Sequence, residues 1–173
     1  MVTANCLSSI AADLRWRSGQ DRPAYSTRAI IRQCFPDTVV TGRHLPHGVL
    51  EVVSRTTDGP IIIYSRSLAG PRQRYAIAHA VAHLIFDDAE SACRPHFVGE
   101  SWVEQRADDF ADELLVPLDC LRPLVTRHPP LVPDGPDHEH YLDTVDEISS
   151  MFQVPSYVID RRIRLLLLPV EKS

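Results

Sequence analysis

Residues 74–86 read RYAIAHAVAHLIF, and this stretch decides the fold of the chain. It is rich in alanine and other apolar residues, follows Pro71 and contains no helix breaker, so it predicts a buried helix. His79 and His83 are four residues apart, and residues at that spacing lie on one face of a helix, one turn above the other. Two imidazoles in this arrangement can bind one divalent metal ion. The stretch therefore predicts a buried helix with two histidines placed to bind one metal ion.

The sequence before this helix contains two helical segments and three β-rich segments. Apolar residues at helical spacing predict helices over residues 5–17 and 26–35, the second with Ser26 as its N-cap. Three short runs rich in valine and isoleucine predict strands at Thr38–Thr41, Val49–Val53 and Pro60–Tyr64. Glycine and proline turns separate these runs, so the first half of the chain is expected to form a small three-stranded sheet.

Helices dominate the second half. Four are predicted, over residues 101–115, 118–125, 138–152 and 155–167. The predicted fold class is therefore α+β, in which a small three-stranded sheet packs against a mostly helical core. At 173 residues the chain fits a single domain. Within it we distinguish a helical N-terminal part (1–45), the sheet with the metal-site helices (46–117), and the C-terminal helices (118–173).

Charge and composition exclude several classes of partner. The net charge of −5 gives the chain no bulk attraction for nucleic acid or anionic membranes. No apolar run approaches the roughly 18 residues that span a bilayer, and the N-terminus lacks the pattern of a signal peptide. The cysteines are scattered without a Cys-x-x-Cys pair, as in proteins of the reducing cytoplasm. We therefore expect a cytoplasmic protein that contacts neither nucleic acid nor membrane directly.

Glu104 is the candidate for a third metal ligand. It shares one face of the predicted helix 101–115 with Ala107, Ala111 and Leu114. A carboxylate on such an apolar face is costly to bury unless something compensates its charge, and a metal ion does so. Two histidines and one carboxylate, with the fourth position left to water, make up a catalytic zinc site. The histidine spacing by itself is only a modest signal, because core or surface histidines at that spacing are more common than metal ligands.

Two groups of arginines flank the predicted helices. Arg72 and Arg74 precede the histidine helix and are expected to face solvent or to form ion pairs. Arg161, Arg162 and Arg164 lie near the C-terminus and are expected to form a solvated helix face. The acidic net charge argues against a DNA-binding role for this second group.

Several motifs together resemble the ImmA/IrrE family of small bacterial and phage metallopeptidases, within the gluzincin-like group. They are the apolar run IIIY (Ile61–Tyr64), the segment RQRYAIAHAVAHL (Arg72–Leu84) and the block EQRADDFADELLVP (Glu104–Pro117). The last block is similar to the family pattern Glu-x-x-Ala-(Asn/Asp)-x-Phe-Ala-x-x-Leu-Leu-x-Pro and is the most specific of the three. The resemblance extends from about Gly48 to Pro117, with a weaker likeness over Met151–Leu167.

This resemblance implies a zincin-like core and a zinc-dependent endopeptidase. It implies that His79, His83 and Glu104 hold one Zn²⁺ ion. The implied substrate is a protein, a helix-turn-helix transcriptional repressor whose cleavage releases its operon under stress. An extended substrate would pair with an exposed sheet edge, which we expect at the 60–65 strand with Ile62, Ile63 and Tyr64.

Ala80 departs from the motif of the family. Where this chain has Ala80, the motif His-Glu-x-x-His has the glutamate that takes a proton from water and passes it to the leaving amine. Loss of a general base typically costs about 10²–10⁴-fold in rate, so the chain is expected to bind zinc without cutting. An engineered Glu→Ala substitution, a natural pseudo-peptidase that sequesters its partner, and a chance likeness all explain the alanine. The intact ligand set favours the first.

Overall fold

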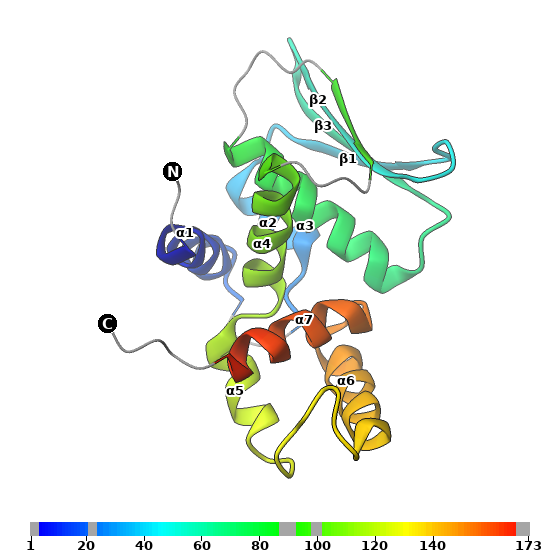
Figure 1. Ribbon diagram of the computed structural model, residues 1–173. Coiled ribbons are helices and arrows are strands. Elements are labelled where there is room, and N and C mark those ends of the chain that lie inside the picture. The colour runs from blue at the N-terminus through cyan, green and yellow to red at the C-terminus, as the bar shows by residue number, and fades with distance from the viewer. Residues whose placement is uncertain (1–3, 21–23, 87–92, 98–101, 169–173) are drawn as a thin grey trace.

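The computed structural model describes residues 4–20, 24–86, 93–97 and 102–168, and its fold is α+β, as predicted (Figure 1). The helices of these residues are α1 (Ala4–Arg17), α2 (Thr27–Cys34), α3 (Gly70–Phe86), α4 (Trp102–Leu115), α5 (Leu118–Val125), α6 (His138–Phe152) and α7 (Ser156–Leu167). The strands are β1 (Val39–Arg43), β2 (Val49–Thr56), β3 (Gly59–Ser65) and β4 (Cys93–Phe97). None of the described helices is long and apolar enough to cross a membrane.

The sheet contains the three predicted strands and a fourth, in the order β1-β3-β2-β4. β2 pairs antiparallel with β3 and with β4, whereas β1 pairs parallel with β3. The additional strand β4 lies in the segment between the two site helices, where the sequence predicts no regular structure. β1 belongs to this sheet, so the N-terminal part of the chain is not only helical.

The prediction that the 60–65 strand is an exposed edge is wrong. β3 lies between β1 and β2, with Ile62 opposite Val40 on one side and opposite Val53 on the other. Its backbone groups are therefore used on both sides, and Ile62, Ile63 and Tyr64 cannot receive a further strand. The non-local parallel pairing of β1 covers the outer side of β3. The sheet edges are β1 and β4.

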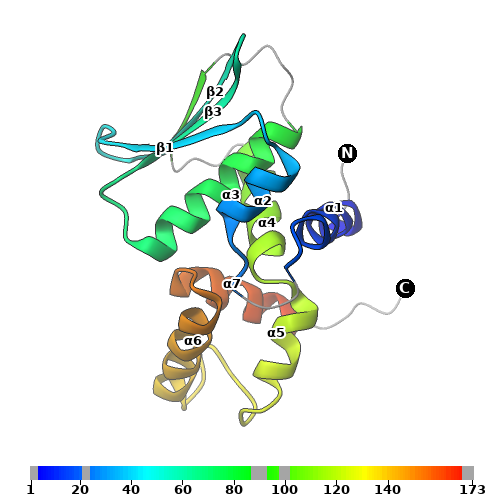
Figure 2. The same cartoon turned by 180° about the vertical axis from the view of Figure 1, so that it is seen from behind.

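Helix α3 is the central element of the fold. It packs against β2 and β3 on one side and against α4 on another, and α2 also contacts it (Figures 1 and 2). Every residue from Tyr75 to His83 is buried. A helix buried all round does not have an amphipathic pattern, which explains why alanine and isoleucine occupy nearly all of its faces. The small alanine side chains allow the neighbouring elements to approach it closely.

Helices α5, α6 and α7 form a second layer on the far side of α3 and α4 from the sheet (Figure 1). Two of the C-terminal arginines join this layer to α4. Arg161 binds Asp112 through Nε and Nη2, both at 2.6 Å. The buried Arg162 donates to the carbonyl of Val116 at 2.9 Å and to Glu113 at 2.6 Å. The prediction of a solvated face is therefore wrong for these two residues, because α7 packs against acidic side chains of α4.

Arg74 clamps three segments of backbone together. Its guanidinium donates to the carbonyls of Phe152 at 2.6 Å and Gln153 at 3.1 Å, and to the carbonyl of Tyr25. Burial lowers the pKa of Arg74 to about 10, which leaves the side chain cationic at neutral pH. The expected solvent or ion-pair role is thus wrong for Arg74, which instead ties the start of α3 to α6 and to the loop before α2. Arg72 is exposed, as expected.

Replacement of Arg74 by alanine should destabilise the protein. Three carbonyl groups would lose a cationic donor, and hydrogen bonds of this kind contribute about 1.5–3 kcal/mol each where burial leaves no replacement. We expect the free energy of unfolding, measured by urea denaturation, to fall by roughly 3 kcal/mol in Arg74→Ala. The exposed neighbour provides the matched control, Arg72→Ala, which should change it by less than about 0.5 kcal/mol. Equal stabilities of the two variants would contradict the clamp.

Candidate metal centre

The two histidines of α3 lie together at the buried centre of the molecule. His79 is fully buried and His83 is 5% exposed, and their Nε2 atoms are 3.0 Å apart. The spacing of one helical turn brings the two rings together, tilted by 57° with their centroids 4.8 Å apart, and the packing of α3 between the sheet and α4 removes both from solvent. Both imidazoles therefore direct Nε2 to one point between the elements.

Glu104 reaches the same point from the first turn of α4. Its Oε2 is 3.1 Å from Nε2 of His79 and 3.6 Å from Nε2 of His83. The structure thus brings together all three residues that the sequence and the resemblance predict as ligands. They are 25 and 21 residues apart along the chain, and the antiparallel approach of α3 and α4 closes this separation.

Glu51 is a fourth member of the cluster that the sequence reasoning missed. It projects from β2, is fully buried, and has Oε1 at 3.8 Å from Nε2 of His79. The ligand atoms of Glu51, His79 and His83 all lie within 4.8 Å of one another. A signal for it exists in the sequence, because Glu51 is in phase with Val49 and Val53, which are also buried. A carboxylate on the inward face of an apolar strand needs a compensating partner.

Asp108 orients His79 from its other ring nitrogen. Its Oδ1 is 3.0 Å from Nδ1 of His79 and accepts a hydrogen bond of 2.8 Å from the hydroxyl of Tyr75. Because Nδ1–H donates to this carboxylate, the neutral ring keeps its proton on Nδ1 and leaves Nε2 to bind a metal ion. Asp108 therefore fixes both the tautomer and the direction of the ring.

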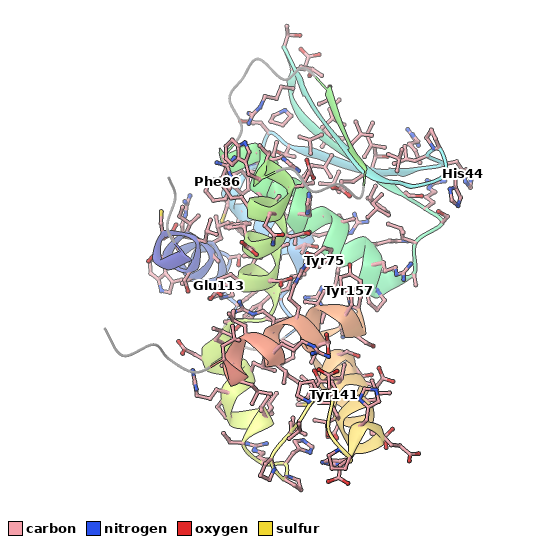
Figure 3. The ribbon with its side chains drawn as sticks, in the orientation of Figure 1. His44, Tyr75, Phe86, Glu113, Tyr141 and Tyr157 are labelled. Carbon is pink, nitrogen blue, oxygen red and sulfur yellow. The ribbon has the colours of Figure 1, made fainter. Side chains whose placement is uncertain are left out.

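A chain of polar groups connects this carboxylate to α7. Nη2 of Arg161 donates to the hydroxyl of Tyr75 at 2.7 Å, and Nη1 lies 3.7 Å from Asp108. Burial opposes the charge of Arg161, but hydrogen bonds to Asp112 and Tyr75 raise its pKa above the usual value. Figure 3 shows Tyr75 and Tyr157 pointing toward one another where α3 meets α7, and their rings pack edge to face at 5.7 Å.

The arrangement around His79 fits a bound cation better than hydrogen bonds alone. One Nε2 atom has three polar neighbours, on His83, Glu104 and Glu51, at 3.0, 3.1 and 3.8 Å. An imidazole nitrogen carries one proton or one lone pair, so it cannot form good hydrogen bonds with all three neighbours. Ligands bound tetrahedrally at about 2.0–2.1 Å from a zinc ion lie roughly 3.3 Å apart. The separations from Nε2 of His79 bracket that value, and the ligand atoms of Glu51, His79 and His83 all lie within 4.8 Å of one another, so this cluster can hold one divalent metal ion.

The electrostatics of His79 follow from its acidic neighbours. Burial lowers its pKa, but hydrogen bonds to Asp108 and Glu104, together with the charge of Glu51, outweigh this effect and raise the pKa to about 9. The metal-free ring is therefore protonated at neutral pH. A metal ion that binds Nε2 has to displace this proton, because metal ligands must be deprotonated.

Ala80 provides no polar atom to the site. It is fully buried and belongs to the hydrophobic core. Its methyl group can neither accept a proton from water nor return one to a leaving group. The cluster therefore has the groups that bind a metal ion, whereas the position of the motif's general base is apolar.

Comparison with known proteins places the chain in a peptidase family. Residues 30–164 match the model of a peptidase family described as the IrrE N-terminal-like domain. No curated protein matches the chain significantly. A solved structure titled "Mycobacterium tuberculosis transcriptional regulator" has a similar fold, with a TM-score of 0.63 and 15% sequence identity, over 98% of this chain and 49% of that chain. The chain thus spans about half the length of that regulator, and at this identity the likeness shows the fold alone.

Removal of the Asp108 carboxylate should weaken metal binding. Without this partner the His79 ring loses its fixed orientation and tautomer, and loss of such partners lowers metal affinity about 10–100-fold. Competition with a chromophoric chelator measures the zinc dissociation constant of Asp108→Ala. The adjacent Asp109 is exposed and provides the control Asp109→Ala, which should bind as the unchanged protein does. An unaltered constant in Asp108→Ala would show that Asp108 does not orient the ligand.

Metal affinity should also depend on pH in a defined direction. Because the pKa of His79 is raised to about 9, binding below that pH displaces one proton from the ring. The apparent affinity for zinc is therefore expected to fall about tenfold for each unit by which the pH is lowered from 8.5 to 7. Calorimetry in buffers of different ionisation enthalpy counts the released protons. An affinity that stays constant over this range would contradict the assignment of His79 as a ligand.

Proposed function

The chain belongs to the peptidase family of the IrrE N-terminal-like domain, and we propose that it is a zinc-holding endopeptidase domain of this type whose hydrolytic step is lost. The observation that carries the proposal is the convergence of His79, His83 and Glu104 on one point beside the apolar Ala80. Two histidines and a carboxylate suit zinc, which polarises water and a scissile carbonyl when it is bound. The side chains of this chain hold and orient the ion, but none at position 80 moves the proton.

The proposed partner is a protein of the helix-turn-helix repressor class. The ImmA/IrrE resemblance of the sequence supports it, as does the presence of the same fold within a transcriptional regulator. An extended partner segment can pair with the outer side of β4, which among the described strands is the sheet edge next to the strand that carries Glu51. We place this interaction in the cytoplasm, without direct contact to nucleic acid or membrane.

The zinc-loaded chain is expected to bind one ion and to leave peptide bonds uncut. Elemental analysis measures the metal content. Cleavage of fluorescently labelled casein, and of a purified helix-turn-helix repressor, is compared with and without EDTA. We expect the two rates to be equal, because loss of a general base typically costs about 10²–10⁴-fold. Cleavage that EDTA abolishes would overturn the proposed loss of hydrolysis.

Two candidate functions within this proposal, an inactivated peptidase and a pseudo-peptidase, predict different effects of substitutions at position 80. If Ala80 alone inactivates a peptidase, Ala80→Glu should gain cleavage that EDTA abolishes, whereas Ala80→Gln, of the same size, should not. If the chain is a pseudo-peptidase that only captures its partner, both variants should remain inert while repressor binding persists. Circular dichroism verifies that the buried substitution leaves the fold intact.

A further inference from the structure

We propose that Glu51 is a fourth ligand of the metal ion, so that four protein side chains saturate it and leave no position to water. This inference rests on the metal site proposed above and changes its character. A catalytic zinc site keeps one open position for water or substrate, whereas a structural site is closed by protein ligands. With Glu51 bound, the ion cross-links β2, α3 and α4.

The position of Glu51 in the sheet favours direct coordination. β2 is hydrogen-bonded to β3 on one side and to β4 on the other, and Glu51 lies opposite Tyr64 of β3. The alternation along β2 directs Glu51 to the buried face together with Val49 and Val53. Its side chain is only 1% exposed, so it has no route to bulk water. A carboxylate held in this way must be compensated within the protein.

The distances allow Glu51 to bind the ion directly. Oε1 of Glu51 is 3.8 Å from Nε2 of His79, close to the roughly 3.3 Å expected between two tetrahedral zinc ligands. The ligand atoms of Glu51, His79 and His83 all lie within 4.8 Å of one another, so these three side chains can reach one ion. Glu104, at 3.1 and 3.6 Å from the two histidines, completes the set of four.

Charge and burial point to the same closed site. Two carboxylates and two neutral imidazoles around a divalent cation form a neutral cluster, which is the least costly form for a site with almost no contact with solvent. His79 and Glu51 are inaccessible, and the side chain of Glu104 is the most exposed of the four, at 17%. A closed site activates no water and so needs no general base. A change from a catalytic to a structural metal site therefore explains both why Glu51 lies beside the histidines and why position 80 is alanine.

Cobalt substitution tests this inference without relying on enzymatic activity. Co²⁺ reports its coordination through its visible absorption spectrum, and azide or thiocyanate changes that spectrum when an open position accepts the anion. We expect the spectrum of the Co²⁺-loaded protein to be unaffected by azide. Glu51→Ala should open a position, so that azide alters its spectrum. A response of the unchanged protein to azide would overturn the closed site.

The isosteric variant Glu51→Gln provides a second readout. Loss of a group that only hydrogen-bonds to a ligand already lowers metal affinity about 10–100-fold, so loss of a ligand should lower the zinc affinity by at least as much. The rise in melting temperature on zinc addition should shrink accordingly. Glu147 on α6 is exposed and provides the control Glu147→Gln, which should leave both quantities unchanged. Equal affinities of Glu51→Gln and the unchanged protein would exclude a ligand role.

The results distinguish this inference from the proposed metal site. If neither the unchanged protein nor Glu51→Gln binds zinc or cobalt, the metal site itself is wrong, and the inference falls with it. If the protein binds one ion that responds to azide, the site stands and only the fourth ligand is excluded. A closed site also predicts that Ala80→Glu gains hydrolysis only together with Glu51→Ala. Cleavage by Ala80→Glu alone would contradict it.

Discussion

The burial of α3 on all sides is the constraint on which the rest of the structure depends. A buried helix with two histidines requires acidic side chains from its neighbours, because isolated polar groups are costly to bury. The sheet provides Glu51, and α4 provides Glu104 and Asp108. The remaining elements keep these three carboxylates in place. In this sense the fold is an arrangement of acidic side chains around two imidazoles.

Local patterns in the sequence were sufficient to predict most of the fold. Helix caps and breakers, such as Ser26 with its bond to the amide of Ala29, mark element boundaries that depend on neighbouring residues only. The parallel pairing of β1 with β3 is non-local, and no local pattern reveals it. This pairing is the reason that β3 was taken for an edge. β4 was missed because its stretch has no clear strand alternation.

The candidate site was predictable to the extent that it follows a helical spacing or a motif. His79, His83 and Glu104 meet both conditions. Glu51 comes from a strand, more than 25 residues before the first histidine, and only its phase with two buried valines marks it as inward-facing. Arg161 likewise looked like an exposed charge, because its partner Asp112 lies 49 residues earlier. Charge pairs between distant elements are set by packing, which spacing along the chain does not encode.

The contact of Arg161 with Tyr75 and Asp108 has a consequence for the order of events during synthesis. The ribosome releases α3 and α4 well before α7, so the histidines and Glu104 can meet while the group that supports Asp108 is still unmade. Until α7 docks, Tyr75 lacks its cationic partner and the His79 ring is held less firmly. The support of the His79 ring is therefore complete only once α7 has packed against α3 and α4.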